Sequence, residues 1–480
     1  MDPYLYPYRY HELIPGIQMK KLISYETESM QKRDFVFLAL SFLPNLLISS
    51  LNESMRFFRT LLPLALAGCI NARECYNFNI PVNIASRQGL FKPVPVEGNI
   101  DIAAFVANYL RPGTNYTAEL LQDYQTLKGS YNISAQYCKP NGGNSDTIQL
   151  LTHGIGFDKT YWDLDFDNYT YSYVNVALKA GYSTLAIDRL GTGLSSQGDP
   201  INEIQAQAEV EALNAVTVML RNGEIPNVGR SYKKVIHVGH SFGSVQTYWL
   251  SALYPNNTDG LILTGFSGTT QFIPYVVAGW NLHSARLNQP VRFGNTTTDG
   301  NQSAINIAGA HLTPADEWNE LATTEVMDLF LGYNETVTSY NYPSGYITSS
   351  DLTSLMYAFL CPGYYDIGLA LEAERTKQPL TIGEMLTMTN TPHSSSFTGP
   401  VLVLTGENDV GFCGGNCSTA VENTSFSNLP AAVKTVFPSA SVFESYIQPN
   451  TGHGINFHYN ASASYWIVQN FLARNGLAAH

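Results

Sequence analysis

The stretch Lys234-Val-Ile-His-Val-Gly-His-Ser241-Phe-Gly243 decides the fold of this chain. Its apolar start predicts a short buried strand over residues 234–238, and the residues that follow predict a helix over 242–253. The turn between them has the pattern Gly-x-Ser-x-Gly, in which the glycines leave space for a sharp turn that holds the serine strained and exposed. The pattern alone is weak in a chain with 38 glycines, and its plain alternative is an ordinary turn. Its place between a strand and a helix makes Ser241 the candidate nucleophile.

A serine hydroxyl is a poor nucleophile, so Ser241 needs a general base and a carboxylate that orients the base. Asp409 follows a predicted strand over 401–404, and His453 follows a predicted strand over 441–447. The chain order serine, aspartate, histidine suits a parallel sheet, because three residues that follow strand ends meet at one edge of it.

Each of these partners has a competitor nearby. Glu407 is the alternative acid, but it lies two residues closer to its strand than Asp409 does. His458 is the alternative base, but it lacks the flanking glycines that free the loop around His453. We therefore expect Asp409 and His453 to serve Ser241.

The negative charge that develops on a substrate oxygen needs backbone N–H donors. One donor is expected from Phe242, directly after the serine. The other is expected from the loop that follows the strand over 147–152, with Ile155 as first choice, although this loop can also be a plain turn. For His240, the histidine next to Ser241, packing beneath the turn is favoured over a place in the pocket. Four neighbours of these residues are the candidates for lining the substrate pocket: His153, Gly154, Gly156 and His240.

Strand and helix alternate through most of the remaining chain. Apolar runs predict strands over 132–138, 147–152, 182–187 and 261–263. Apolar residues at helical spacing predict helices over 205–221 and 463–472. Such alternation indicates an α/β fold with a mostly parallel sheet and helices on both faces.

This alternation breaks between residues 267 and 398, where Asn, Gly, Thr and Pro cluster around helical patches over 352–360 and 367–375. Structureless loops of this length are rare. We therefore expect 267–398 to form a cap inserted after the sixth strand, and 73–266 with 399–480 to form the core.

The composition excludes several classes of protein. The 480 residues carry 26 Lys and Arg against 39 Asp and Glu, a formal net charge of −13. Nucleic acids and anionic membrane surfaces need clustered positive charge, so neither is expected as the main partner. With 44% apolar and 12% aromatic residues, the chain can bury a large core, and disorder is not expected.

The first 72 residues are expected to be a leader. The basic start after Met55, the short apolar stretch and the small residue Ala72 match a secretory signal peptide over 55–72, and residues 1–54 then need not belong to the natural product. An earlier apolar run over 35–51 predicts the alternative, an uncleaved membrane anchor, and a soluble intracellular chain is a third interpretation. Both runs are shorter than the ~20 residues of a membrane span, so we expect a secreted mature protein without one.

Cysteines and glycosylation motifs agree with export. The spacing Cys413-Gly-Gly-Asn-Cys417 can close a tight disulfide, since its alternative, half of a metal site, lacks a second ligand pair nearby. Cys75 and Cys138 flank the first strands and can pair, which leaves Cys361 free. Ten Asn-x-Ser/Thr motifs follow Ala72, at Asn115, Asn132, Asn168, Asn256, Asn295, Asn301, Asn334, Asn416, Asn423 and Asn460.

Taken together, the motifs His153-Gly-Ile-Gly156, Asp188-Arg-Leu-Gly-Thr-Gly-Leu-Ser195, Gly239-His-Ser-Phe-Gly243, Asp409 and His453-Gly resemble the α/β-hydrolase superfamily, in its serine esterase and lipase branch, over roughly residues 75–475. The leader, the glycosylation motifs and the Cys413–Cys417 loop are similar to secreted fungal hydrolases. The resemblance implies Ser241 as nucleophile, His453 as base, Asp409 as its orienting acid and an oxyanion hole from Ile155 and Phe242, with no cofactor and no metal.

The same resemblance implies the chemistry. Epoxide hydrolases and haloalkane dehalogenases of this fold carry Asp where this chain has Ser241, which favours hydrolysis of a carboxylic ester or lactone through an acyl-serine intermediate. A small-molecule substrate of medium size and apolar character is expected from the aromatic residues of the predicted cap. Hydrolysis of an amide or a C–C bond by the same residues is one alternative, and a non-catalytic binding protein on this fold is another.

Overall fold

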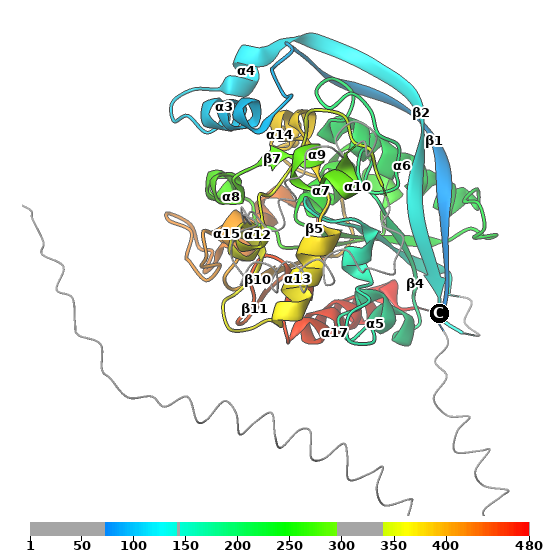
Figure 1. The fold of residues 1–480 in the computed structure, drawn as a ribbon. Helices are drawn as coiled ribbons and strands as arrows, with labels where there is room; N and C mark the ends of the chain where they lie inside the picture. Colours follow the sequence, from blue (N-terminus) through cyan, green and yellow to red (C-terminus); the bar gives the residue numbers. More distant parts are fainter. Residues whose placement is uncertain (1–72, 142–144, 295–338, 480) are drawn as a thin grey trace, which may run out of the picture. The chain divides into compact units, whose positions relative to one another are not determined.

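One eight-stranded sheet forms the centre of the computed structural model, which describes residues 73–141, 145–294 and 339–479 (Figure 1). The strand order is β1-β2-β4-β3-β5-β6-β10-β11. The six strands from β4 to β11 pair in parallel, while β1 pairs antiparallel with β2 and β2 with β4. The mostly parallel sheet is thus confirmed, with these bounds: β1 (Glu74–Phe91), β2 (Leu121–Lys139), β3 (Thr147–Thr152), β4 (Ser183–Ile187), β5 (Lys234–His240), β6 (Gly260–Thr264), β10 (Val401–Gly406) and β11 (Phe443–Gln448).

Helices cover both faces of this sheet. Helix α6 packs against α7, and α5 packs against α17 on the opposite face (Figure 1). The central strands β3, β4 and β6 are buried along their whole length, as strands covered on both faces must be. These helices are α5 (Tyr173–Lys179), α6 (Ala206–Asn222), α7 (Phe242–Leu253) and α17 (Ala461–Leu472). The bounds of α6, α7 and α17 lie within two residues of those that the sequence predicts.

Strands β1 and β2 form a long hairpin that the sequence only partly indicated. Burial alternates along β1, with Ile80, Val82 and Ile84 facing inward and their neighbours exposed. The far end of the hairpin carries α3 (Asn99–Tyr109) and α4 (Tyr116–Leu120), which Figure 1 draws in blue and cyan.

The chain between β6 and β10 forms an insertion, which follows the sixth strand as expected. Its predicted helical patches correspond to α12 and α13. The part described consists of helices around a three-stranded antiparallel sheet in the order β7-β8-β9. The elements are α8 (Ile273–Trp280), β7 (His283–Ser284), α9 (Ala285–Asn288), α10 (Pro290–Phe293), β8 (Tyr346–Thr348), α12 (Leu352–Phe359), α13 (Ile367–Thr376), β9 (Leu380–Thr381) and α14 (Ile382–Thr387).

The remaining elements are short. They are α15 (Val410–Cys413) and α16 (Leu429–Ala432), the 3₁₀ turns η1 (Lys159–Trp162), η2 (Pro255–Asn257), η3 (Val433–Val436) and η4 (Ile455–Phe457), and the π turn η5 (Ala473–Leu477). Within the described ranges, no helix combines the length and the apolar character needed to cross a membrane. The expected leader, 1–72, lies outside the described residues.

Candidate active site

Ser241 is the single residue between β5 and α7, and its backbone has a conformation that residues other than glycine rarely adopt. Its φ is 54° and its ψ is −119°, a strained region that residues occupy only where the surroundings enforce it. The close packing around the two glycines of the motif explains how this conformation of Ser241 is held. A Cβ on Gly243 would lie 2.2 Å from the carbonyl oxygen of Thr152, and a Cβ on Gly239 would lie 2.4 Å from that of Gly243. The turn can therefore pack against β3 only with glycine on both sides of the serine.

Three loops at the ends of β5, β10 and β11 bring Ser241, Asp409 and His453 together. The Ser241 Oγ–His453 Nε2 distance is 2.7 Å, and the His453 Nδ1–Asp409 Oδ2 distance is 2.6 Å. A carboxylate can only accept, so Nδ1 carries the proton and donates it to Asp409, which leaves Nε2 to accept from the serine hydroxyl. Asp409 and His453 are buried, and Ser241 is 9% exposed.

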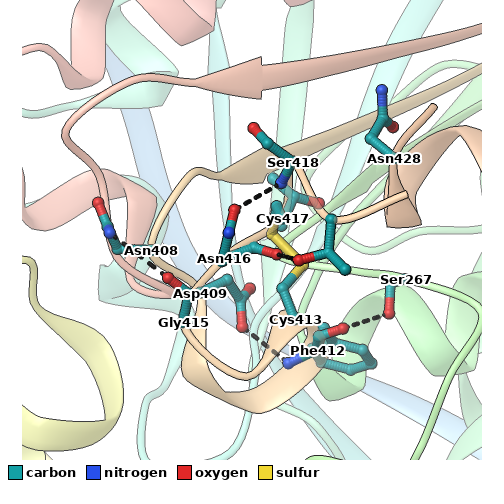
Figure 2. Close-up of a disulfide and its surroundings, with 12 residues drawn as sticks. Ser267, Asn408, Asp409, Phe412, Cys413, Gly415, Asn416, Cys417, Ser418 and Asn428 are labelled. Atoms are coloured by element: carbon teal, nitrogen blue, oxygen red, sulfur yellow. Dashed lines mark hydrogen bonds between the residues drawn. A yellow bond between two sulfur atoms is a disulfide. The ribbon is translucent and has the colours of Figure 1, made fainter. Parts of the chain in front are cut away.

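Asp409 is held by the short loop that carries it. Its Oδ1 accepts from the backbone N–H of Phe412 at 2.8 Å and so caps helix α15. The disulfide between Cys413 and Cys417 closes the loop that follows Asp409, as Figure 2 shows. The competing acid Glu407 instead accepts from the backbone N–H of Asn450 at 3.0 Å.

His458, the competing base, braces the loop of His453. Its Nε2 accepts from the backbone N–H groups of Gly452 at 3.0 Å and Cys361 at 2.9 Å, and its Nδ1 donates to the carbonyl of Gly454 at 3.0 Å. Burial lowers the pKa of His458 to about 4, so the ring is neutral and able to accept at neutral pH. His458 thus holds both neighbours of His453 and one residue of the insertion, a role that spacing in the sequence did not reveal.

The expected oxyanion donors lie beside the nucleophile. Ile155 and Phe242 both line the cavity that contains Ser241 and His453. Phe242 is the first residue of α7, and the first N–H groups of a helix have no acceptor inside the helix. Gly154 allows this approach, because a Cβ there would lie 2.8 Å from Cβ of Ser241.

The structure corrects the expected pocket residues. His153, Gly154 and His240 do not line the Ser241 cavity, because they form the packed layer behind the turn. His153 accepts from the backbone N–H of Arg189 through Nε2 and donates to the carbonyl of Gly154 through Nδ1, and burial lowers its pKa to about 3.

His240 packs beneath the turn, which is the interpretation that the sequence favoured. Its ring stacks on that of Tyr161 with centroids 4.4 Å apart, and burial holds its pKa well below the ordinary value. Gly156, the fourth expected residue, lines a separate small cavity next to the first.

The cavity beside Ser241 is almost entirely apolar. Helix α8 of the insertion supplies one side, and only two threonines add polarity besides the reacting residues. The lining consists of Ile155, Phe242, Val245, Thr270, Ile273, Val276, Val277, Trp280, Met388, Thr389, Gly411 and Phe412, with Ser241 and His453.

Four aromatic residues of the insertion, Phe293, Tyr340, Tyr342 and Tyr346, form a small core of their own. Tyr340 and Tyr342 stack on each other with centroids 5.6 Å apart and pack against Phe293. Among the aromatic residues described there, Trp280 lines the Ser241 cavity.

A buried ionic cluster joins the core to the insertion, and sequence analysis missed it. Nη1 of Arg189 lies 2.5 Å from carboxylate oxygens of both Glu209 on α6 and Glu384 on α14. The guanidinium also lies over the ring of Phe242, 4.9 Å from its centroid. The three charged residues are nearly devoid of solvent contact, and burial raises the pKa of Glu209 well above its usual value.

Both expected disulfides are present in the structure. Cys75 pairs with Cys138 at the base of the hairpin, and Cys413 pairs with Cys417. Cys361 is free and buried, with its Sγ 3.2 Å from Oδ1 of Asn408.

The strained serine follows β5, the aspartate follows β10 and the histidine follows β11. Together with the insertion after β6, this arrangement defines an α/β-hydrolase fold with a serine-centred site. The model of the alpha/beta hydrolase family matches residues 149–461, and the chain belongs to this family. No curated protein matches the chain.

Solved structures that are similar to this chain have low sequence identity to it. An esterase of Thermogutta terrifontis is 13% identical with a TM-score of 0.38, covering 72% of this chain and 94% of its own. An epoxide hydrolase of Vigna radiata is 13% identical with a TM-score of 0.39, covering 72% and 95%. Est1E of Butyrivibrio proteoclasticus, solved with ferulic acid, is 12% identical with a TM-score of 0.37, covering 72% and 96%.

Proposed function

We propose that this protein is a serine hydrolase that cleaves carboxylic esters or lactones through an acyl-serine intermediate. The observation that carries the proposal is the continuous hydrogen-bonded path from Ser241 through His453 to Asp409, with distances of 2.7 and 2.6 Å. A Ser–His–Asp arrangement of this kind makes a serine hydroxyl nucleophilic.

The proposed reaction starts with attack of Ser241 Oγ on the carbonyl carbon while His453 Nε2 takes the hydroxyl proton. Asp409 keeps the ring oriented and stabilises the positive charge that it gains. The N–H groups of Ile155 and Phe242 donate to the oxyanion of the tetrahedral intermediate. His453 then gives the proton to the leaving alcohol, and the acyl group stays on Ser241.

Water completes the proposed cycle. His453 takes a proton from the water as it attacks the acyl-serine, a second tetrahedral intermediate forms at the same donors, and the acid leaves as Ser241 regains its proton. Because the cavity beside Ser241 is apolar, we expect it to favour esters with an apolar group over strongly polar substrates.

Epoxide hydrolases occur among the structural neighbours, but the residue at the turn favours acyl transfer. The enzymes of this fold that open epoxides attack with a carboxylate, and this chain has Ser241 in that position. Amide and C–C hydrolysis would use the same three residues, so substrate trials must separate them from ester hydrolysis.

The proposal is tested by labelling with a fluorophosphonate probe and by turnover of p-nitrophenyl esters, an anilide and a β-diketone. We expect the wild type to label and to favour the esters, and Ser241→Ala to lose both labelling and turnover. Ser244→Ala is the matched control, because Ser244 lies one turn along α7 and donates to the carbonyl of Thr264. A folded wild-type protein that never labels would overturn the proposal, and preference for the anilide or the diketone would move it to those classes.

We further propose that the protein is exported through the signal peptide over 55–72 and glycosylated. Support comes from the exposed position of most described motif asparagines: Asn115, Asn132, Asn168, Asn256, Asn416 and Asn423. Asn460 is half-buried and its Nδ2 donates to the carbonyl of Pro449 at 2.8 Å, so we expect no glycan there. Asn295, Asn301 and Asn334 lie outside the described residues.

Peptide mapping of secreted protein before and after glycan removal, with N-terminal sequencing, tests export. A start at Arg73 and modified asparagines at the exposed motifs are expected. A protein retained in the membrane with residues 35–51 intact would support the anchor alternative instead.

A further inference from the structure

Two neighbouring cavities share one wall near the nucleophile. The first is the Ser241 cavity described above. The second, here called the inner cavity, lies between the loop at Gly156 and the insertion, with Leu355 and Phe359 among its lining residues. Ile155 and Trp280 line both cavities. The space beside Ser241 therefore continues beyond these two side chains.

Trp280 is the part of this wall that can change independently of the reaction. Ile155 is expected to supply a backbone donor to the oxyanion, whereas Trp280 comes from the end of helix α8 in the insertion. The indole is 7% exposed, and its ring centroid lies 6.0 Å from that of Phe359. The carbonyl of Trp280 accepts from Ser350 at 2.9 Å, which holds the backbone without using the side chain.

The two cavities differ in chemistry. The Ser241 cavity is apolar up to Trp280. The inner cavity is lined by apolar residues such as Leu355 and Leu380 and also by the polar residues Lys377 and Gln378. Lys377 is fully buried and pairs with Glu374, and its Nζ also donates to the carbonyl of Ser349 at 2.9 Å. A chain that passed Trp280 would therefore contact both apolar and polar side chains.

We propose that Trp280 is a specificity-determining residue that limits the length of the apolar chain accepted by the Ser241 site. This inference rests on the proposed ester hydrolysis. The indole closes the Ser241 cavity at the point where the inner cavity begins, so the wild-type enzyme favours chains that end before it. Removal of the indole joins the cavities and admits a longer chain.

The experiment measures kcat/KM for two ester series with chains of two to about twelve carbons, the p-nitrophenyl alkanoates and the n-alkyl acetates. The first series varies the acyl chain and the second the alcohol chain. We expect Trp280→Ala to move the optimum to longer chains in one series, because each methylene newly buried can raise kcat/KM by up to about fourfold. The series that shifts identifies which part of the ester occupies the cavity.

Three further variants isolate the effect. Trp466→Ala removes an exposed tryptophan on α17 and should leave the profile unchanged. Leu355→Phe in the Trp280→Ala background fills the inner cavity and should return the optimum to shorter chains. Trp280→Phe keeps a smaller ring and should give a smaller shift, and it carries the test if Trp280→Ala does not fold.

The two possible failures are distinguishable. Trp280 variants that label with fluorophosphonate and hydrolyse acetates, but keep the wild-type chain-length profile in both series, would overturn this inference alone. A wild-type enzyme that neither labels nor hydrolyses any ester would overturn the proposed function on which the inference rests.

Discussion

At the scale of single residues, the site selects one of two chemically similar side chains that lie close together in the sequence. Asp409 and Glu407 are two residues apart, yet only Asp409 reaches His453. His453 and His458 are five residues apart, yet only His453 reaches Ser241. In each pair, the path of the backbone after the strand decides which side chain joins the hydrogen-bonded path to the serine.

Replacement of Asp409 tests this distinction. Asp409→Asn should lower kcat by about 10⁴-fold, because an amide no longer holds the productive tautomer of His453. Glu407→Gln is the matched control and should stay near wild-type activity, since the Glu407 carboxylate accepts from a backbone N–H of the next loop whereas His453 donates to Asp409. Steady-state kinetics on one ester decides the matter, and a larger loss in Glu407→Gln would reverse the assignment.

His458 gives the protein a pH-dependent stability. Burial holds the folded-state pKa at about 4, below the ordinary 6.5, so between these values the unfolded chain binds a proton that the folded protein refuses. Stability from this group is therefore lost as the pH falls from about 6.5 to about 4 and changes no further below that.

His458→Gln removes this titration while keeping an acceptor. The free energy of unfolding in urea should then fall less steeply with decreasing pH than in the wild type, by up to about 1.4 kcal/mol per pH unit between pH 6.5 and 4. Identical slopes in the two proteins would contradict the role given to His458.

At the scale of elements, two disulfides stabilise different things. Cys413 and Cys417 are four residues apart and close the loop of Asp409, whereas Cys75 and Cys138 are 63 residues apart and join the ends of β1 and β2, at the base of the hairpin. The chain-entropy estimate gives about 2 kcal/mol for the first loop and about 4 kcal/mol for the second. Loss of the Cys413–Cys417 disulfide should therefore affect activity more, and loss of the Cys75–Cys138 disulfide should affect stability more.

Paired serine substitutions separate the two effects. Cys413→Ser with Cys417→Ser should lower kcat strongly and stability modestly, because the acid loop loses its closure. Cys75→Ser with Cys138→Ser should lower stability more and leave kcat of the folded fraction nearly unchanged. Unfolding curves and active-site titration measure both, and equal losses of kcat would count against the link between the acid loop and its disulfide.

At the scale of the whole molecule, the core and the insertion are held together by buried polar contacts. Arg189 joins Glu209 of the core to Glu384 of the insertion. The far end of the hairpin adds two more links to the insertion: Asn99 Oδ1 accepts from the backbone N–H of Ser284, and the hydroxyl of Tyr109 donates to the carbonyl of Met385.

Removal of Arg189 tests how far these parts depend on one another. Arg189→Met leaves two buried carboxylates without their cation and should cost about 3–5 kcal/mol. It should also lower kcat, because the guanidinium packs on Phe242. Arg474→Met, which removes an exposed pair with Glu444, should change stability little. Urea unfolding followed by kinetics checks both, and equal stability of the two variants would refute the role of the cluster.

The sequence by itself determined the elements that depend on local patterns. Apolar runs predicted the central strands, helical spacing predicted α6, α7 and α17, and glycines marked the turn at Ser241, because each signal lies within a few neighbouring residues. The order of strands and motifs then placed three reactive residues at one sheet edge. Close cysteine spacing predicted the Cys413–Cys417 disulfide for the same local reason.

Only the tertiary structure decided what depends on contacts between distant segments. The brace at His458, the cluster at Arg189 and the wall at Trp280 each join residues far apart in the sequence, and no local pattern records such pairings. The same reason moved His153 out of the expected pocket: it follows β3, but the packing around the turn places its ring in the interior, as it does the ring of His240 at the end of β5. Proximity to a motif in the chain predicts proximity in space, and the fold alone decides which way a side chain points.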